Sequence, residues 1–120
     1  MLTFVVSFEL TPGRCNAMSD VNLIDPLGRK LRLHEQTWVA HILRRHPEMG
    51  AHRELVENAV NNPIEIRLSP TDPDCRFYFG LGPRPGILVV VVGDVVKRMV
   101  KTTHLVRSMK GVVEWSRPTQ

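Results

Sequence analysis

The stretch GILVVVVGD, residues 86–94, decides the fold because its six consecutive apolar residues are flanked by glycines. An apolar run of this length between turn residues is typical of a strand that is buried on both faces of a sheet. It is also far shorter than the roughly 20 apolar residues that a membrane-spanning helix needs. We therefore expect a central strand in a soluble, cytoplasmic protein without a membrane segment.

Alternating segments on both sides of this run predict the neighbouring strands. PIEIRL (residues 63–68) alternates apolar with charged side chains, and CRFYF (residues 75–79) puts Arg76 and Tyr78 on the same face. VKRMVKTTHLV (residues 96–106) follows the apolar run closely enough to be its hairpin partner. Together these segments predict an antiparallel meander of about four strands.

Two helices are predicted before the meander. The first, at about residues 35–45, has an apolar stripe when its residues are placed at 100° intervals, made of Trp38, Val39, Ile42 and Leu43. The second, at about residues 51–61, has apolar residues at helical spacing and ends at an Asn-Asn-Pro sequence. We expect both helices to pack on the same face of the sheet.

The segment before the helices predicts a hairpin. VNLIDPLGRKLRL (residues 21–33) has two short runs with apolar residues around an Asp-Pro-Leu-Gly turn, and LTFVVSFEL (residues 2–10) is a further candidate strand. The predicted fold class is α+β: an N-terminal hairpin and two helices packed on an antiparallel sheet of about four strands. Residues 1–120 form one domain in this prediction, with a poorly readable segment 1–20 and a core at 21–115.

Positive charge is concentrated in residues 29–53. The chain has a net charge of +4, and this window holds six Lys or Arg residues against two Asp or Glu, together with four of the five histidines. Such a surface suits a phosphate-bearing partner such as RNA, although a solvated basic helix face would give the same pattern. The basic residues that we take as candidates for RNA binding are Arg29, Lys30, Arg32, Arg44 and Arg45.

The densest part of this window is HILRRHPEM, residues 41–49, which carries two histidines. His46 falls in the apolar stripe of the first helix and precedes Pro47, so we place it at the helix C-terminus. There the helix dipole favours the charged imidazolium, whereas apolar neighbours favour the neutral ring. His41 lies on the flank of the helix. The two histidines are therefore not expected to be equivalent.

Several segments together resemble, in order, the phage-associated members of the barnase, EndoU, colicin and RelE nuclease group (PBECR domains). The resemblance covers about residues 25–115, and its departures include His104, at a position where the family usually has tyrosine. The segments that carry it are DPLGRKLRLHEQTWVAHILRRHPEM (25–49), VENAVNNPIEIR (56–67), RFYF (76–79), LVVVV (88–92), MVKTTHL (99–105) and KGVVEW (110–115).

This resemblance implies a BECR fold like that of RelE and barnase, and metal-independent cleavage of RNA without a cofactor. Such a reaction needs a base for the ribose 2′-hydroxyl, a cation for the phosphorane and an acid for the leaving oxygen. His41 and His46 are five residues apart, which does not match the i, i+4 spacing of a zinc-binding HExxH helix. The residues that the resemblance places in the site are His41, His46, Arg76, Tyr78 and Thr102, and His104 is a further acid/base candidate. Among them, His41 is the first candidate for base or acid, and Arg76 is the candidate cation for the phosphorane, since its planar guanidinium can bind two phosphate oxygens.

Two functions remain open from the sequence. The first is a bacterial ribonuclease, for example the toxin of a toxin–antitoxin or phage-conflict system, with a protein antitoxin or inhibitor as a partner. The second is an inactive nuclease-like domain that binds RNA or a protein through its basic surface. The ribonuclease hypothesis requires His41, Arg76 and Thr102 to face one cleft.

Overall fold

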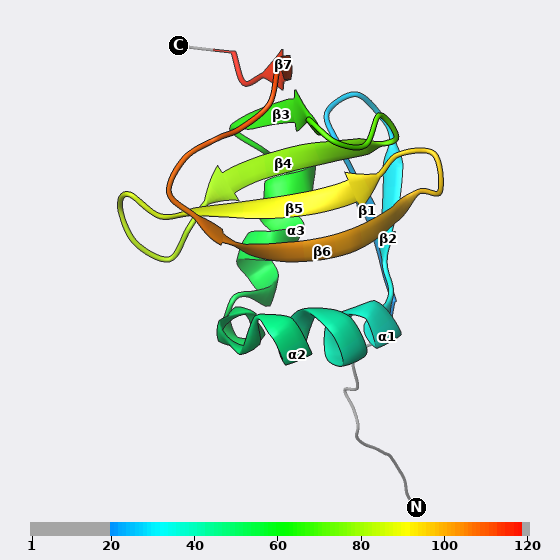
Figure 1. Ribbon diagram of the computed structural model, residues 1–120, viewed down its shortest axis with the longest axis vertical. Helices are drawn as coiled ribbons and strands as arrows, with labels where there is room; N and C mark the ends of the chain where they lie inside the picture. The colour runs from blue at the N-terminus through cyan, green and yellow to red at the C-terminus, as the bar shows by residue number, and fades with distance from the viewer. Residues whose placement is uncertain (1–19, 119–120) are drawn as a thin grey trace, which may run out of the picture.

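A curled, seven-stranded mixed sheet forms most of the molecule (Figure 1). The computed structural model describes residues 20–118, so the strand expected at residues 2–10 lies outside the described residues. The strand order is β1-β2-β6-β5-β4-β3-β7. In chain order the strands are β1 (Val21–Ile24), β2 (Lys30–Leu33), β3 (Glu65–Leu68), β4 (Cys75–Leu81), β5 (Leu88–Asp94), β6 (Met99–Val106) and β7 (Val113–Ser116).

Strand β5 lies at the centre of the sheet, as its apolar sequence predicts. It pairs antiparallel with β4 on one side and with β6 on the other. Three of its valines, Val89, Val90 and Val91, are at most 3% exposed. The predicted order of β3, β4, β5 and β6 as an antiparallel meander is confirmed by their pairing.

Helix α3 (Arg53–Asn61) covers one face of the sheet and lies behind β4 and β5 in Figure 1. Its apolar residues Val56, Ala59 and Val60 recur at helical spacing and are fully buried. Gly80 of β4 allows this contact, because a Cβ at that position would lie 2.8 Å from the Cβ of Ala59. The absence of a side chain there brings helix and strand backbones close together. We call this side of the sheet the α3 face and the other side the open face.

A second helical segment lies along β6 at the lower edge of the sheet in Figure 1. It consists of α1 (Glu35–Thr37), the π-helical turn η1 (Trp38–Ile42) and α2 (Leu43–Arg45), and it is followed by the 3-10 turn η2 (Pro47–Ala51). Trp38 and Ile42 are buried, as the apolar stripe predicts. Val39 is 49% exposed, because the wider π turn changes which side chains face the sheet. No helix among residues 20–118 is long and apolar enough to cross a membrane.

The predicted fold class is wrong. The sheet has seven strands rather than about four, it is mixed rather than antiparallel, and short helices accompany it. The hairpin β1–β2 forms with the expected antiparallel pairing, but it joins the same sheet through a parallel contact in which the Arg32 amide donates to the Arg98 carbonyl at 2.9 Å. The tail adds β7 next to β3. Both additions are non-local pairings, and local sequence patterns do not encode which distant segments pair.

Candidate functional site

The predicted site residues of β4 and β6 lie on opposite faces of the sheet. Paired residues of neighbouring strands share a face, and Phe77, Val92 and Thr102 form one such row across β4, β5 and β6. Arg76 and Tyr78 flank Phe77 in the sequence and therefore point to the α3 face, whereas Thr102 points to the open face. The single cleft with Arg76 and Thr102 that the ribonuclease hypothesis requires is not formed.

On the α3 face, Arg76 and Tyr78 belong to a network of partnered charges. The Tyr78 hydroxyl donates to Asp25 Oδ2 at 2.6 Å, and Arg29 Nε donates to the same oxygen at 2.8 Å. Arg29 Nη2 and Nη1 reach the two Glu114 oxygens at 2.7 Å and 3.1 Å. Arg76 Nε donates to Glu114 Oε2 at 2.9 Å. This network, which we call the α3-face network, ties the β1–β2 turn to β4 and β7.

The surroundings of the α3-face network favour a neutral Tyr78 and an ionised Glu114. Burial, together with the hydrogen bond to Asp25, raises the pKa of Tyr78 above its ordinary value. Burial opposes ionisation of Glu114, but the hydrogen bonds from Arg29 and Arg76 outweigh burial and lower its pKa. Arg76 therefore neutralises a carboxylate of its own chain. Arg76 and Tyr78 thus both have carboxylate partners within the chain, Glu114 for Arg76 and Asp25 for Tyr78.

The open face carries a groove of about 500 Å³. Its floor is apolar and comes from β4 and β5, one edge is His104 of β6, and the other wall is the connection between β6 and β7. The connection crosses one end of the sheet in Figure 1, opposite the β5–β6 turn. The lining residues are Phe77, Phe79, Val90, Val92, His104, Val106, Arg107, Ser108 and Lys110.

His46 and His104 meet at the edge of this groove. Their ring centroids are 5.0 Å apart and the ring planes differ by 22°, so the imidazoles stack. His46 reaches this position because the helix ends at Arg45 and Pro47 begins the next turn, which places the ring over β6. Thr102 shares the open face with His104, two residues away on the same strand. Two predicted site histidines and the predicted threonine therefore lie together.

The environment of His104 favours its neutral form. Burial and the neighbouring His46 lower the pKa of His104, and only Glu48 acts in the opposite direction. Within residues 20–118, no group lies at hydrogen-bonding distance from the buried Nδ1 of His104. A buried polar atom without a partner is uncommon and costs stability. Because Nδ1 is enclosed, Nε2 is the nitrogen that can reach a ligand in the groove.

Two cations of the groove wall have no ion-pair partner in the described part of the chain. Arg107 and Lys110 are both exposed, and neither contacts a carboxylate there. The connection that carries them is fixed by Arg67, whose Nη1 donates to the carbonyls of Met109 and Gly111 at 3.0 Å and 3.2 Å. Hydrogen bonds from Arg67 therefore hold the segment that carries the two cations. The charges of Arg107 and Lys110 remain available for an anion.

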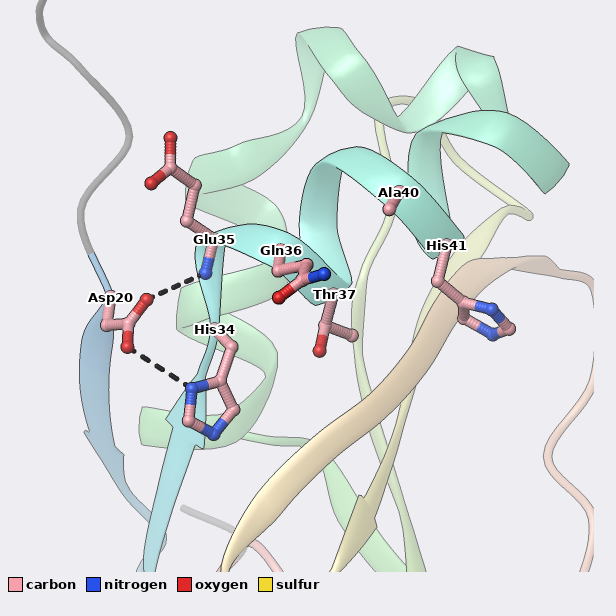
Figure 2. A pocket seen from close by; sticks show the side chains of 7 residues that line it. All are labelled: Asp20, His34, Glu35, Gln36, Thr37, Ala40 and His41. Carbon is pink, nitrogen blue, oxygen red and sulfur yellow. Dashed lines mark hydrogen bonds and ion pairs between the residues drawn. The ribbon is translucent and has the colours of Figure 1, made fainter.

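His41 lies in a different hollow, shown in Figure 2. At one end of this hollow Asp20 accepts a hydrogen bond from the Glu35 amide at 2.8 Å and pairs with His34 Nδ1 at 3.2 Å. The amide hydrogen bond and then the His34 contact lower the pKa of Asp20. His41 is at the other end of the hollow in this view. Asp20 therefore caps the start of α1, and His41 is separate from the His46–His104 pair.

The five basic residues predicted to bind RNA do not form one surface. Arg29 is in the α3-face network, and Arg32 Nε donates to Asn22 Oδ1 at 3.1 Å. Lys30 lines a small hollow beside Arg98, at the β1–β2 and β5–β6 turns. Arg44 and Arg45 are exposed on the last helical turn, next to His46 in sequence. Of the five, only these two adjoin a member of the histidine pair in the sequence.

Arg107, Lys110 and Phe77 line the groove but were not expected as site residues from the sequence. A signal for the cations is visible in RSMK, residues 107–110, where two basic residues directly follow the strand that carries His104. Phe77 gave no signal beyond that of an ordinary strand residue. Comparison of the chain with family models, with curated proteins and with solved structures gives no significant match. The geometry and chemistry of the open-face groove therefore carry the functional argument.

Proposed function

We propose that the chain is a metal-independent ribonuclease whose reaction centre is the His46–His104 pair. The observation that carries this proposal is the stacking of the two imidazoles at the edge of a groove that also presents Arg107 and Lys110. Cleavage of RNA by its own 2′-hydroxyl needs a base, an acid and a cation near one phosphate. In this proposal His104 and the His46 ring stacked on it are base and acid, and Arg107 and Lys110 of the groove wall are the cations.

The two histidines have different roles in this proposal. A neutral His104 takes the proton of the ribose 2′-hydroxyl through Nε2, and the 2′ oxygen attacks the phosphorus. The bond from phosphorus to the 5′ oxygen breaks, and a protonated His46 gives its proton to that oxygen. The products are a 2′,3′-cyclic phosphate and a 5′-hydroxyl. Burial and then the neighbouring His46 lower the pKa of His104, which favours the neutral ring that a base needs.

The remaining groups of the open face would bind the phosphate. Arg107 is suited to hold two phosphate oxygens with its planar guanidinium, and Lys110 adds a second charge. Thr102 can donate its hydroxyl from the position next to His104 on the same face. The shared cleft of His41, Arg76 and Thr102 that was expected from the sequence is not formed, so the proposal gives no catalytic role to His41 or Arg76. Arg107 and Lys110 take the place of Arg76, which is bound to Glu114 on the α3 face.

The resemblance of the sequence to PBECR nucleases supports the same reaction. His46 and Thr102 fall on family positions, and His104 replaces a family tyrosine at the reaction centre proposed here. Membership of that family remains a proposal. The role as a toxin with a protein antitoxin, which rests on the resemblance alone, remains a prediction.

An RNA cleavage assay in the presence of EDTA tests the proposal. The wild-type protein is expected to release fragments with 2′,3′-cyclic phosphate ends. His104→Asn and His46→Asn are each expected to reduce the rate by about 100-fold or more. His52→Asn is the matched control and should cut at the wild-type rate, because His52 precedes α3 outside the groove.

Three results would contradict the proposal: no cleavage of any RNA tested, unimpaired cleavage by both histidine variants, or products that end in a 5′-phosphate. The folded fraction of every variant is measured by circular dichroism, so that loss of folding is not scored as loss of chemistry.

A further inference from the structure

We infer that the open-face groove takes single-stranded RNA and stacks one unpaired base on Phe77. The inference rests on the proposed function, because it concerns the part of the same groove that the cleavage chemistry does not use. The proposed chemistry uses His104 as an acid/base group and Arg107 and Lys110 as cations. They do not account for the apolar floor, which consists of Phe77, Phe79, Val90 and Val92.

The floor lies beside the reaction centre in the sheet. Phe77, Val92 and Thr102 form one row across β4, β5 and β6, and Phe79, Val90 and His104 form the adjacent row. Neighbouring strands are about 4.8 Å apart, so β4 is roughly 10 Å from β6. A nucleotide whose phosphate is held at β6 can therefore reach β4 with its base.

Phe77 is the floor residue that can receive a base. Phe79 is 2% exposed, whereas Phe77 remains partly exposed. The two rings meet edge to face with centroids 6.2 Å apart and planes at 86°, a contact that favours this orientation of Phe77. A rigid, partly exposed aromatic ring next to free cations is the combination that binds single-stranded nucleic acids, because every base has a face that can stack.

A duplex cannot use this floor. Each base inside a double helix is covered on both faces by its neighbours, so stacking on Phe77 would require unstacking and unpairing. Exposed cations alone would attract single strands and duplexes alike, since both carry phosphates. The apolar floor is therefore the feature that selects the unpaired strand.

The test uses a short 2′-deoxy oligonucleotide containing the fluorescent base 2-aminopurine, which lacks the 2′-hydroxyl and cannot be cut. The wild-type protein is expected to quench the fluorescence of the single strand and to bind it at least about tenfold more tightly than the same strand annealed to its complement. Phe77→Leu keeps an apolar side chain but removes the ring, and should lose about tenfold in affinity. Val96→Ala, at a 66% exposed apolar residue of the β5–β6 turn, should bind as the wild type does.

The outcomes separate this inference from the proposed function. Equal affinity for single strand and duplex, or an unchanged affinity of a folded Phe77→Leu variant, would overturn the inference even if RNA is cleaved. Quenching that depends on Phe77 would support it even if the wild type cuts no RNA, in which case the ribonuclease proposal alone fails. Urea unfolding of Phe77→Leu establishes that the variant is folded under the binding conditions.

Discussion

Charged side chains have partners on the α3 face of the sheet, whereas the cations of the open-face groove have no carboxylate partner within residues 20–118. On the α3 face, Arg29 and Arg76 share the carboxylate of Glu114, and Tyr78 and Arg29 share that of Asp25. On the open face, Arg107 and Lys110 lack a carboxylate partner in the described chain. Arg29 and Arg76 are therefore paired with carboxylates, whereas the charge of Arg107 is available to a ligand.

The pairing of a charged residue, rather than its type, therefore indicates its role. A partly buried arginine bound to a carboxylate of its own chain has its charge compensated there, so it is less available to a substrate phosphate. An exposed cation without a partner contributes little to stability and remains free to bind phosphate. Chemistry is therefore expected on the open face, and mutations there and on the α3 face should change different measured quantities.

The largest expected effect on stability comes from Glu114→Gln. The substitution leaves Arg29 and Arg76 without the charge that they share, and should lower the free energy of unfolding by about 2 kcal/mol, less than for a fully buried pair because Glu114 is 21% exposed. Urea denaturation measures the change. Asp74→Asn is the control, since Asp74 is exposed and unpaired within residues 20–118, and should stay within about 0.5 kcal/mol. Equal midpoints for the two variants would remove the structural role of the α3-face network.

A smaller effect is expected for Lys110→Gln, and it should appear in binding rather than in folding. Loss of one phosphate contact should weaken binding of a single-stranded oligonucleotide by several-fold and reduce the slope of log affinity against log salt by about 0.7. Lys97→Gln, in the β5–β6 turn outside the groove, is the control and should keep the wild-type slope. If both lysine variants reduce the slope equally, the groove has no special part in binding.

The smallest effect is expected in the pH dependence of stability. Because the folded-state pKa of His104 is below 6.5, the unfolded chain binds more protons between that lowered value and pH 6.5, and stability should fall as pH decreases through this window. Urea midpoints of His104→Gln should lack that decrease. The lowered pKa of Glu114 acts at lower pH, where stability is lost as pH falls below 4.5 toward the folded-state pKa. Parallel midpoint curves for wild type and His104→Gln near pH 6 would contradict the lowered pKa of His104.

Much of the local structure could be predicted from the sequence. Period-two alternation predicted the strands of the meander and which residues of β4 share a face. Apolar residues at helical spacing predicted α3 and the burial of Trp38 and Ile42. The sheet as a whole could not be predicted, because the parallel β2–β6 contact and the β3–β7 pair join segments far apart in the chain. The helical wheel failed at Val39 because it assumed an α-helix where a π turn forms.

The candidate site was predictable only in part, for the same reason. His46, Thr102 and His104 were singled out and lie together on the open face. Arg76 was an attractive phosphate ligand in isolation, but its role depends on Glu114, which is 38 residues away in the chain and belongs to a strand that the sequence analysis did not predict. Pairing of this kind is decided by tertiary structure.

The most direct test of the account compares the RNA cleavage rate per folded molecule of two matched variants, Arg107→Gln and Arg76→Gln. The account predicts that Arg107→Gln cuts at least about tenfold more slowly with an unchanged urea midpoint. Arg76→Gln should cut at the wild-type rate per folded molecule while its midpoint falls. A folded Arg76→Gln variant that loses cleavage, beside an Arg107→Gln variant that retains it, would place the chemistry on the α3 face and contradict the account.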